Sequence, residues 1–385
     1  MDFRLTPEQE AFRREVEEFL ARELPGERRA IREDGWITGF SRAFSRKLGA
    51  RGWIGLTWPR RHGGQERSPL DRLVLTETLL RAGAPVAAHW LGDRQVGPAL
   101  LAHGSEAQQE FFLPRIARGE IVFCVAMSEP AAGSDLAATS TLALEDGDGF
   151  VIRGQKVWTS FAHQAEYGYL VARTNPEAPK HRGLSEFVVD MRTPGITVRP
   201  LLDMVGEHHF NEVFFDEVRV PRTALVGVKD RGWQQIVAQL DFERGGIERV
   251  ISNYPLLQDA VAWARAAGVT RDPRVRDRLA RLHIELHAAR LLVYRTAWRL
   301  SRGERPTWET ALTKLIGTEL EQEIAEAVLG LLGPAGLLLP GAPGAPLAGR
   351  AARAALYAPA YTIQGGTANI LRNIIAIRGL GLPAD

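Results

Sequence analysis

The order of residue patterns along the chain most constrains its fold. Before residue 120, apolar residues recur at helical spacing, as at Phe12, Val16 and Phe19. Residues 121–220 instead form short runs rich in Val, Phe, Tyr and Thr, separated by Gly, Asp and Pro. Helical spacing returns after Pro221. This order predicts an α+β chain with an N-terminal all-α domain, a middle antiparallel β-barrel or sandwich domain and a C-terminal helix bundle.

The boundaries of the three expected domains fall at residues 1–120, 121–226 and 227–385. The expected helices are residues 7–24, 68–81, 93–103, 105–116, 232–267, 272–302, 306–332 and 367–378. Pro255 lies inside the fifth of these helices and is expected to kink or divide it. The expected strands are residues 121–127, 150–160, 167–174, 184–191, 196–201 and 212–220.

Composition and charge narrow the class of protein. The 385 residues are 45% hydrophobic and 24% charged, which is ordinary for a soluble globular chain. A net charge of +2 gives no reason to expect nucleic acid or an anionic membrane as partner. The single cysteine, Cys124, excludes an internal disulfide and fits a reducing cytosol. Residues 1–20 do not resemble a signal peptide, so we expect a cytoplasmic protein without a membrane span.

The string from Ala126 to Asp135, Ala-Met-Ser-Glu-Pro-Ala-Ala-Gly-Ser-Asp, is the first candidate site. Pro130 removes a backbone donor and stops a strand. Residues 131–133 are nearly without side chains, so a flat ligand has access to the backbone. Ser128 and Ser134 add hydroxyls suited to a polar heterocycle or a carbonyl. An ordinary exit from a strand into a loop explains this string equally well when it is taken alone.

Two further strings follow in the β region. Residues 154–160, Gly-Gln-Lys-Val-Trp-Thr-Ser, are by themselves typical of a strand edge with a core tryptophan. The expected strand over residues 212–220 follows, and His208 and His209 precede it. Neighbouring histidines point in different directions, and no carboxylate or cysteine cluster at ligand spacing accompanies them. We therefore interpret the two histidines as surface or pocket-rim residues and predict no metal site.

The last candidate string is residues 361–372, Tyr-Thr-Ile-Gln-Gly-Gly-Thr-Ala-Asn-Ile-Leu-Arg. Gly365 and Gly366 precede Thr367, which is suited to begin a helix. The amide groups and the positive end of that helix would face whatever lies before it. A plain helix cap is the alternative interpretation of this string.

Together these strings resemble the acyl-CoA dehydrogenase family, and the resemblance covers nearly the whole chain. It implies the family fold, with a C-terminal four-helix bundle, and FAD as cofactor. Trp158 matches the family tryptophan that packs on the flavin, and Ser160 matches a hydroxyl that is often threonine. The flavin contacts that the resemblance implies are Met127, Ser128, Trp158, Thr159, Ser160, Thr367 and Asn369; the implied substrate contacts are Ser134, Glu243 and Gly366.

One position departs from the family pattern in an informative way. Many members carry a catalytic glutamate where this chain has Gly365, which retains only its backbone N–H for the thioester oxygen. Long-chain and isovaleryl-type members instead carry their base at the position of Glu243, beside a family arginine that matches Arg244. The resemblance therefore implies Glu243 as the catalytic base. An exposed helix carboxylate is the alternative for Glu243.

Two family segments that grip the FAD of a neighbouring subunit are missing. Residues 270–273, Thr-Arg-Asp-Pro, stand where the family has Arg-x-x-Phe-Gly, and residues 332–336 stand near the place of Gln-x-x-Gly-Gly-x-Gly. These departures leave open how the adenosine half of FAD is held. They also leave open whether the chain forms a homotetramer or dimer, as the resemblance implies, or a hetero-oligomer with a related subunit.

The resemblance implies conversion of an acyl-CoA thioester to the trans-2-enoyl-CoA, with electrons passed to an electron-transferring flavoprotein, as in fatty acid β-oxidation. A flavin oxidase or monooxygenase on the same fold is a second possibility. A non-catalytic subunit of a hetero-oligomeric dehydrogenase is a third, because of Gly365 and the missing segments.

Overall fold

The computed structural model describes residues 3–24, 33–243 and 245–384, without the side chains of residues 238–243. The chain divides into two compact units. Unit 1 comprises Met1–Gly39, Arg67–Ala84 and Asp241–Asp385; unit 2 comprises Phe40–Glu66 and Pro85–Leu240. Each unit is described by itself.

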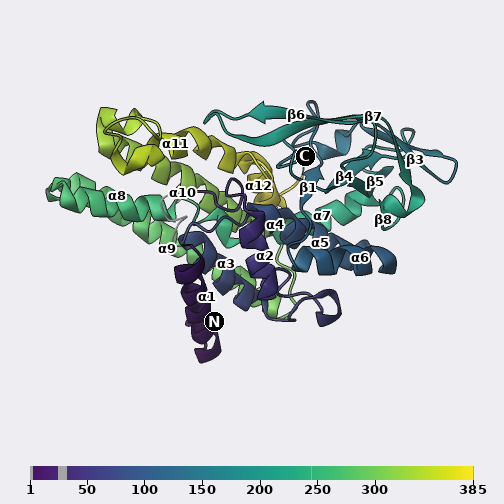
Figure 1. The fold of residues 1–385 in the computed structure, drawn as a ribbon. Helices are drawn as coiled ribbons and strands as arrows, with labels where there is room; N and C mark the ends of the chain where they lie inside the picture. Colours follow the sequence, from purple (N-terminus) through teal and green to yellow (C-terminus); the bar gives the residue numbers. More distant parts are fainter. Residues whose placement is uncertain (1–2, 25–32, 244, 385) are drawn as a thin grey trace. The chain divides into compact units, whose positions relative to one another are not determined.

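Unit 1 is helical. Its α-helices are α1 (Pro7–Glu23), α3 (Pro69–Arg81), α8 (Tyr254–Ala266), α9 (Pro273–Ser301), α10 (Trp308–Leu332), α11 (Arg350–Tyr357) and α12 (Ala368–Ile374). The N-termini of α1 and α3 form capping boxes, in which Thr6 pairs with Gln9 and Ser68 with Asp71. The long helices α9 and α10 lie side by side (Figure 1). On α10, Ala311 and Leu315 pack against Leu371 of α12.

Short helical turns link these helices. They are η6 (Ile247–Arg249), η7 (Val269–Arg271), η8 (Gly333–Leu337), η9 (Pro346–Gly349), η10 (Ala358–Thr362) and the π-turn η11 (Ile375–Gly379). The expected final helix over residues 367–378 is therefore α12 continued by η11.

Unit 2 combines helices with the sheet. Its helices are α2 (Arg42–Ala50), η2 (Arg60–His62), α4 (Ala87–Leu91), the π-turn η3 (Gly92–Val96), α5 (Gly97–His103), α6 (Glu106–Ala117), η4 (Leu136–Ala138), η5 (Arg222–Ala224) and α7 (Gly232–Glu243), whose last residues belong to unit 1. Its strands are β1 (Phe123–Ala126), β2 (Leu142–Asp146), β3 (Gly149–Lys156), β4 (Tyr167–Arg173), β5 (Leu184–Asp190), β6 (Ile196–Leu202), β7 (His208–Pro221) and β8 (Leu225–Val226).

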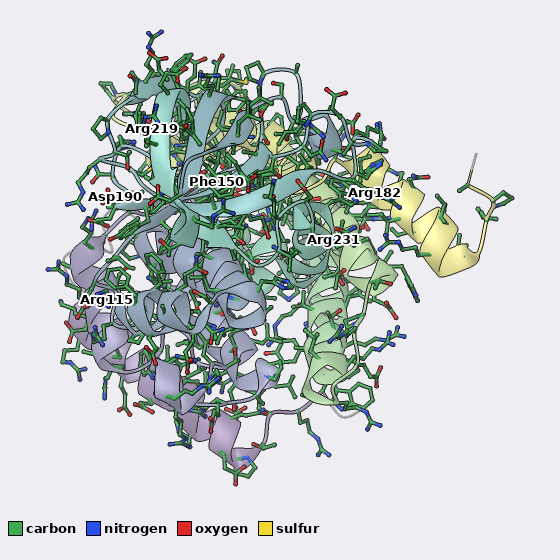
Figure 2. All side chains as sticks on the ribbon, turned by 90° about the vertical axis from the view of Figure 1, so that its right-hand side faces the viewer. Arg115, Phe150, Arg182, Asp190, Arg219 and Arg231 are labelled. Carbon is green, nitrogen blue, oxygen red and sulfur yellow. The ribbon has the colours of Figure 1, made fainter. Side chains whose placement is uncertain are left out.

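The strands form one sheet in the order β6-β7-β3-β2-β4-β5-β8, with β1 beside β4. Most neighbours are antiparallel, while β1 and β2 each pair with β4 in parallel. Phe150 meets Phe187 edge-on in the core of the sheet, with ring centroids 5.0 Å apart. In Figure 2, charged side chains such as Arg219 and Asp190 stand around Phe150. They pair at the surface, Arg219 with Asp146 and Asp190 with Arg192.

The predicted succession of helices, sheet and helices is confirmed, and five details differ. Helix α2 and helix α11 were not expected, and neither was strand β2. The expected helix over residues 93–103 begins earlier, because α4, η3 and α5 run on from Ala87. The last difference is the division of residues 232–267, described below. No helix among the described residues is long and apolar enough to cross a membrane.

Candidate active site

The loop after β1 folds back on itself. Glu129 and Ala132 exchange two backbone hydrogen bonds of 3.0 and 3.1 Å, so Pro130 lies at a tight turn. Ser128 accepts a hydrogen bond from the Val157 N–H (2.9 Å), which ties this loop to the residues that follow β3. The strings around Ser128 and Trp158, separate in sequence, therefore form one structure in unit 2.

A buried ion pair underlies this loop. Lys156, fully buried at the end of β3, donates to the Glu129 carboxylate and to the Met127 carbonyl, both at 2.8 Å. The Glu129 carboxylate also accepts hydrogen bonds from Ser140 N and Oγ (2.7 and 2.6 Å) and from Thr141 N (2.9 Å). These hydrogen bonds to the Glu129 carboxylate fix the loop on which Ser128 lies.

Burial and the attraction between the two charges shift the pKa values of both Glu129 and Lys156. Burial raises the pKa of Glu129, but Lys156 and the hydroxyl and amide donors outweigh burial and bring that pKa down to about 2. Burial lowers the pKa of Lys156 to about 8, against the attraction of Glu129. Both groups are therefore ionised at neutral pH, and each supplies the charge that the other requires inside the protein.

The turn after β3 holds Trp158 in an unusual conformation. Its φ of +59° lies in the left-handed region, which a bulky residue rarely adopts. Thr159 keeps the turn in place, because its N–H donates to the Asn211 carbonyl and its carbonyl accepts from Asn211 Nδ2, both at 3.0 Å. The Trp158 ring meets Phe210 edge-on at 5.6 Å and remains 56% exposed. The fold thus maintains a strained turn that presents an open aromatic surface.

The start of β7 holds this turn through hydrogen bonds of Asn211. Asn211 is fully buried, and its Oδ1 accepts from His163 Nδ1 (3.2 Å) and His208 Nε2 (2.8 Å). The imidazoles of His163 and His208 stack with centroids 4.0 Å apart. The prediction of surface histidines is correct for His208, which is exposed, and wrong for His209, which is 3% exposed.

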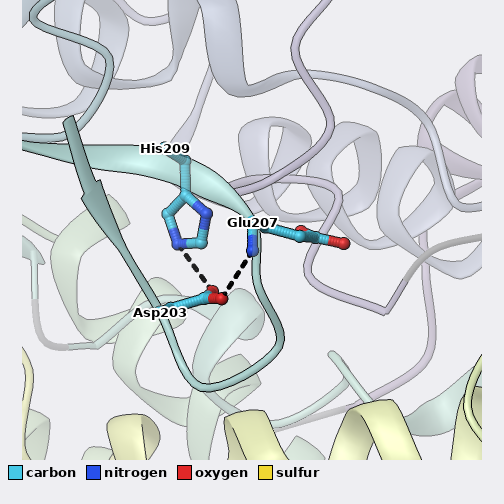
Figure 3. Close-up of side chains that lie close together, drawn as sticks. All are labelled: Asp203, Glu207 and His209. Carbon is cyan, nitrogen blue, oxygen red and sulfur yellow. Dashed lines mark hydrogen bonds and ion pairs between the residues drawn. The ribbon is translucent and has the colours of Figure 1, made fainter.

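The β6–β7 hairpin brings His209 toward two carboxylates. Figure 3 shows its imidazole above Asp203, with His209 Nε2 3.7 Å from Asp203 Oδ2. Asp203 Oδ1 accepts from the Val205 and Glu207 N–H groups, both at 2.9 Å, and so closes the hairpin. Ligand atoms of Asp203, Glu207 and His209 lie within 4.8 Å of one another, a grouping that sequence spacing did not reveal. Its evident contribution is to shape the hairpin, since Asp203 already accepts two backbone hydrogen bonds.

The hydroxyls around the turn fit a flavin. The side-chain hydroxyls of Ser128, Ser134 and Ser160 form no hydrogen bond within the described residues, and none of the three residues is buried. A planar, polar heterocycle needs an aromatic or apolar wall and hydrogen-bond partners at its edge, and this region offers both. The Thr159 side chain is buried, and its Oγ1 has no hydrogen-bond partner among the described residues. Thr159 contributes through its backbone.

The predicted residues Gly365 and Gly366 lie in unit 1. Gly365 and Gly366 have φ of +65° and +102°, which glycine adopts without strain. Lys314 of α10, fully buried, donates to the Gly366 carbonyl at 2.9 Å and to the Tyr361 carbonyl at 3.4 Å. The Nε2 of Gln364, next to Gly365, is buried and has no hydrogen-bond partner among the described residues.

One of the two residues predicted to contact the outer part of the cofactor already makes a hydrogen bond within the protein. Thr367 caps α12, and its Oγ1 accepts from the Ile370 N–H at 3.3 Å. Asn369 is exposed in the first turn of α12. Where the two FAD-gripping segments are missing, residues 270–273 cap the start of α9 through Asp272, and residues 333–337 form η8.

The predicted base ends a helix. Glu243 is the last residue of α7, its side chain is outside the described part of the structure, and Arg244 lies outside the described residues altogether. The helix expected over residues 232–267 is divided at this point, and α8 begins at Tyr254. A Cβ at Gly245 would lie 3.1 Å from the methyl groups of Thr296 and Thr310, so close packing favours glycine there.

Family models match the chain in three consecutive parts. The models of the acyl-CoA dehydrogenase N-terminal, middle and C-terminal domains match residues 6–120, 124–218 and 230–380. The chain belongs to the acyl-CoA dehydrogenase family. It is 37% identical to the acyl-CoA dehydrogenase IpdE1 of Mycobacterium tuberculosis and 36% identical to FadE26 of the same organism, with 98% of each chain covered in both cases.

Solved structures agree with this assignment. A structure described as the Tcur3481-Tcur3483 steroid ACAD (acyl-CoA dehydrogenase) superposes with a TM-score of 0.92 at 36% identity, covering 100% of both chains. The ChsE4-ChsE5 complex from Mycobacterium tuberculosis superposes with a TM-score of 0.89 at 35% identity, again over 100% of both chains. This chain is accordingly an acyl-CoA dehydrogenase, an oxidoreductase of a family of FAD-dependent flavoproteins.

Sequence reasoning missed three residues of this acyl-CoA dehydrogenase that support the predicted site: Glu129, Lys156 and Asn211. A weak signal existed for Lys156, which falls at the end of an apolar strand pattern. Lys314 was also missed, although it lies three residues after Ala311 and one before Leu315, on the buried stripe of its helix. A charged residue in phase with a core stripe is the signal that would have found both lysines.

Proposed function

We propose that this acyl-CoA dehydrogenase binds FAD against the Trp158 turn. The open Trp158 ring, held at φ +59° beside the unbonded hydroxyls of Ser128 and Ser160, carries this proposal. Bound FAD supplies the acceptor for the β-hydrogen of the substrate. Met127 and Thr159 contribute backbone positions, and Thr367 and Asn369 address the outer part of the cofactor. The exposure of a large aromatic side chain on a strained backbone would otherwise go unexplained.

For the reaction we propose α,β-dehydrogenation of an acyl-CoA thioester to the trans-2-enoyl-CoA, with an electron-transferring flavoprotein as acceptor. Glu243 removes the α-proton, and Arg244 lies beside it in the sequence. The Gly365 N–H binds the thioester oxygen, with Gly366 and Ser134 as further substrate contacts. Anaerobic mixing of the purified flavoprotein with a panel of acyl-CoAs tests this proposal. Bleaching of the flavin absorbance by at least one thioester is expected, and no bleaching by any would contradict it.

The names of the relatives favour a bulky substrate. A solved structure that superposes on this chain is described as a steroid ACAD. In this chain α7 ends at Glu243 and helical order resumes only at η6 and α8. We propose a steroid-type acyl-CoA as substrate, because an interrupted helix next to the base leaves more room than a continuous one. A straight-chain acyl-CoA that reduces the flavin faster than every steroid acyl-CoA would contradict this choice.

We also propose assembly with a related second chain. The ChsE4-ChsE5 complex and the Tcur3481-Tcur3483 protein are both named for two chains. Here the two segments that grip FAD across a subunit boundary are replaced by helix ends at residues 270–273 and 333–337. Light scattering and the flavin content of the chain purified alone test the idea. A yellow homotetramer with one FAD per chain would contradict it, whereas a colourless chain that gains FAD with a partner would support it.

A further inference from the structure

Lys314 is a buried cation in the helical unit. It lies in α10, is 0% exposed, and donates to two main-chain carbonyls, those of Gly366 (2.9 Å) and Tyr361 (3.4 Å). Moving an ammonium group out of water is unfavourable unless hydrogen bonds or an opposite charge compensate for the lost hydration. The position of these acceptors shows which segment the ammonium holds.

That segment is the turn from Tyr361 to Gly366. Its two glycines adopt φ of +65° and +102° and would be the most mobile residues of the segment if left to themselves. The Gln364 N–H, bonded to the Ala360 carbonyl at 2.9 Å, fixes the start of the turn. Lys314 bonds the carbonyl at its end. The ammonium therefore fixes the Tyr361–Thr362 and Gly366–Thr367 peptide groups, between which Gly365 lies.

Packing of the helices does not require the ammonium. Ala311 and Leu315 of α10 already bury Leu371 of α12 in an apolar cluster, with Ala368 and Ile374 packed against it. An apolar residue at position 314 would serve that packing as well. A lysine at this position adds hydrogen bonds to the turn.

We propose that Lys314 is a positioning residue for the thioester-binding turn. It holds the Gly365–Gly366 turn so that the Gly365 amide meets the thioester oxygen at hydrogen-bond distance. This inference rests on the proposed function of Gly365. A donor for a developing oxyanion is effective only when it is pre-set near 2.7–3.1 Å from the oxygen, so small drifts of a two-glycine turn reduce the rate.

The test compares Lys314→Met with a matched control on the same helix. Methionine has a similar length and no donor. Thr318→Val is the control, because Thr318 is also fully buried on α10 and its hydroxyl bonds only carbonyls of its own helix, at 2.7 and 3.4 Å. Hydrogen exchange of residues 361–367 is measured in the flavin-loaded proteins. Exchange about tenfold faster in Lys314→Met, and unchanged in Thr318→Val, is expected.

A second readout concerns the reaction. With the acyl-CoA that reduces the wild-type flavin fastest, Lys314→Met should slow reduction by roughly 10–10³-fold, toward the loss seen when one oxyanion donor is removed. Flavin content should stay the same. Lys314→Gln, which keeps a shorter donor, should fall between Lys314→Met and wild type, and it replaces Lys314→Met if that variant does not fold.

The outcomes separate this inference from the proposed function. If no acyl-CoA reduces the wild-type flavin, the proposed reaction fails, and the exchange experiment still decides whether Lys314 holds the turn. Unchanged exchange at residues 361–367 in a folded Lys314→Met or Lys314→Gln protein overturns the inference. Faster exchange with a wild-type reduction rate also overturns it, because the turn would then move without consequence for the thioester.

Discussion

Each of the two units holds one predicted site segment with a buried lysine, and the two lysines donate to different kinds of acceptor. In unit 2, Lys156 donates to a carboxylate, Glu129, and to the Met127 carbonyl. In unit 1, Lys314 donates to the carbonyls of Tyr361 and Gly366. A full opposite charge fixes the loop of the proposed flavin half, while peptide dipoles fix the turn of the proposed thioester half.

This difference predicts how mutations of the two lysines affect stability and rate. Loss of Lys156 leaves the Glu129 carboxylate buried without its counter-charge, which is strongly destabilising. Loss of Lys314 leaves carbonyl groups that have lost one donor, a smaller penalty. The flavin half should therefore respond to mutation mainly through stability. The thioester half should respond mainly through rate.

The largest expected effect is on rate in the thioester half. Glu243→Gln keeps the size and hydrogen bonding of the side chain but cannot accept the α-proton. Flavin reduction by the best acyl-CoA should slow by roughly 10²–10⁴-fold, with flavin content and thermal stability near wild type. Stopped-flow absorbance under anaerobic conditions measures the rate.

A glutamate introduced at position 365 controls for this variant. In the Glu243→Gln background, Gly365→Glu places a carboxylate where many family members have one, and part of the rate should return with a changed preference among acyl chains. Wild-type reduction by Glu243→Gln alone would show that Glu243 is not the base. The base would then have to be sought among other carboxylates or in a partner chain.

The next effect concerns stability in the flavin half. Lys156→Met should lower the free energy of unfolding by about 3–5 kcal/mol, because one member of a buried ion pair remains. The double variant Glu129→Gln with Lys156→Met should recover a large part of this loss, since no charge is then left buried. Urea unfolding of the three proteins measures it. Equal losses in the single and double variants would show that hydrogen bonding, and not charge, holds the loop.

The same pair predicts how stability depends on pH. The folded-state pKa of Glu129, about 2, lies below its usual value of 4.5, so its stabilising contribution is complete above about pH 4.5. That contribution is lost as pH falls from about 4.5 through 2. The folded-state pKa of Lys156, about 8, lies below 10.5, so stability rises as pH increases from 8 to 10.5. Unfolding midpoints across pH should lose both slopes in the double variant, and slopes that persist would assign them to other groups.

Local signals account for the parts of the fold that the sequence predicted. The capping boxes at Thr6 and Ser68 are complete within four residues, and both helices begin where the pattern placed them. Helix α11 gave no such signal, because its buried side chains are mostly alanine and no apolar stripe marks them. Pro255 was expected to kink or divide a helix. It lies in the first turn of α8, where proline is favoured, and the break itself falls at Gly245 and Gly246.

The sequence motifs predicted which residues belong to the candidate site, but they did not predict the contacts that hold those residues in place. Trp158, Ser128 and Gly365 were named from strings that resemble a family. The contacts that hold these residues join positions far apart in the chain, such as Glu129 with Lys156 and Lys314 with Gly366. Such pairs depend on the register of strands and the packing of helices, which one sequence does not specify. The exposure of Trp158 and its left-handed backbone likewise emerged only from the fold.

The smallest expected effect tests the aromatic wall of the flavin half. Trp158→Ala should weaken FAD binding by about 0.5–1.5 kcal/mol beyond the loss of buried area, the usual worth of a stacked aromatic pair. Trp158→Phe, which keeps a ring, should retain most of the affinity. Trp158→Gly separates the ring from the backbone, because glycine adopts a φ of +59° without strain. Fluorescence titration of the apoproteins with FAD should rank Phe above both Gly and Ala, with Gly and Ala alike in affinity. If Gly instead binds FAD as tightly as wild type, the turn and not the ring forms the flavin seat.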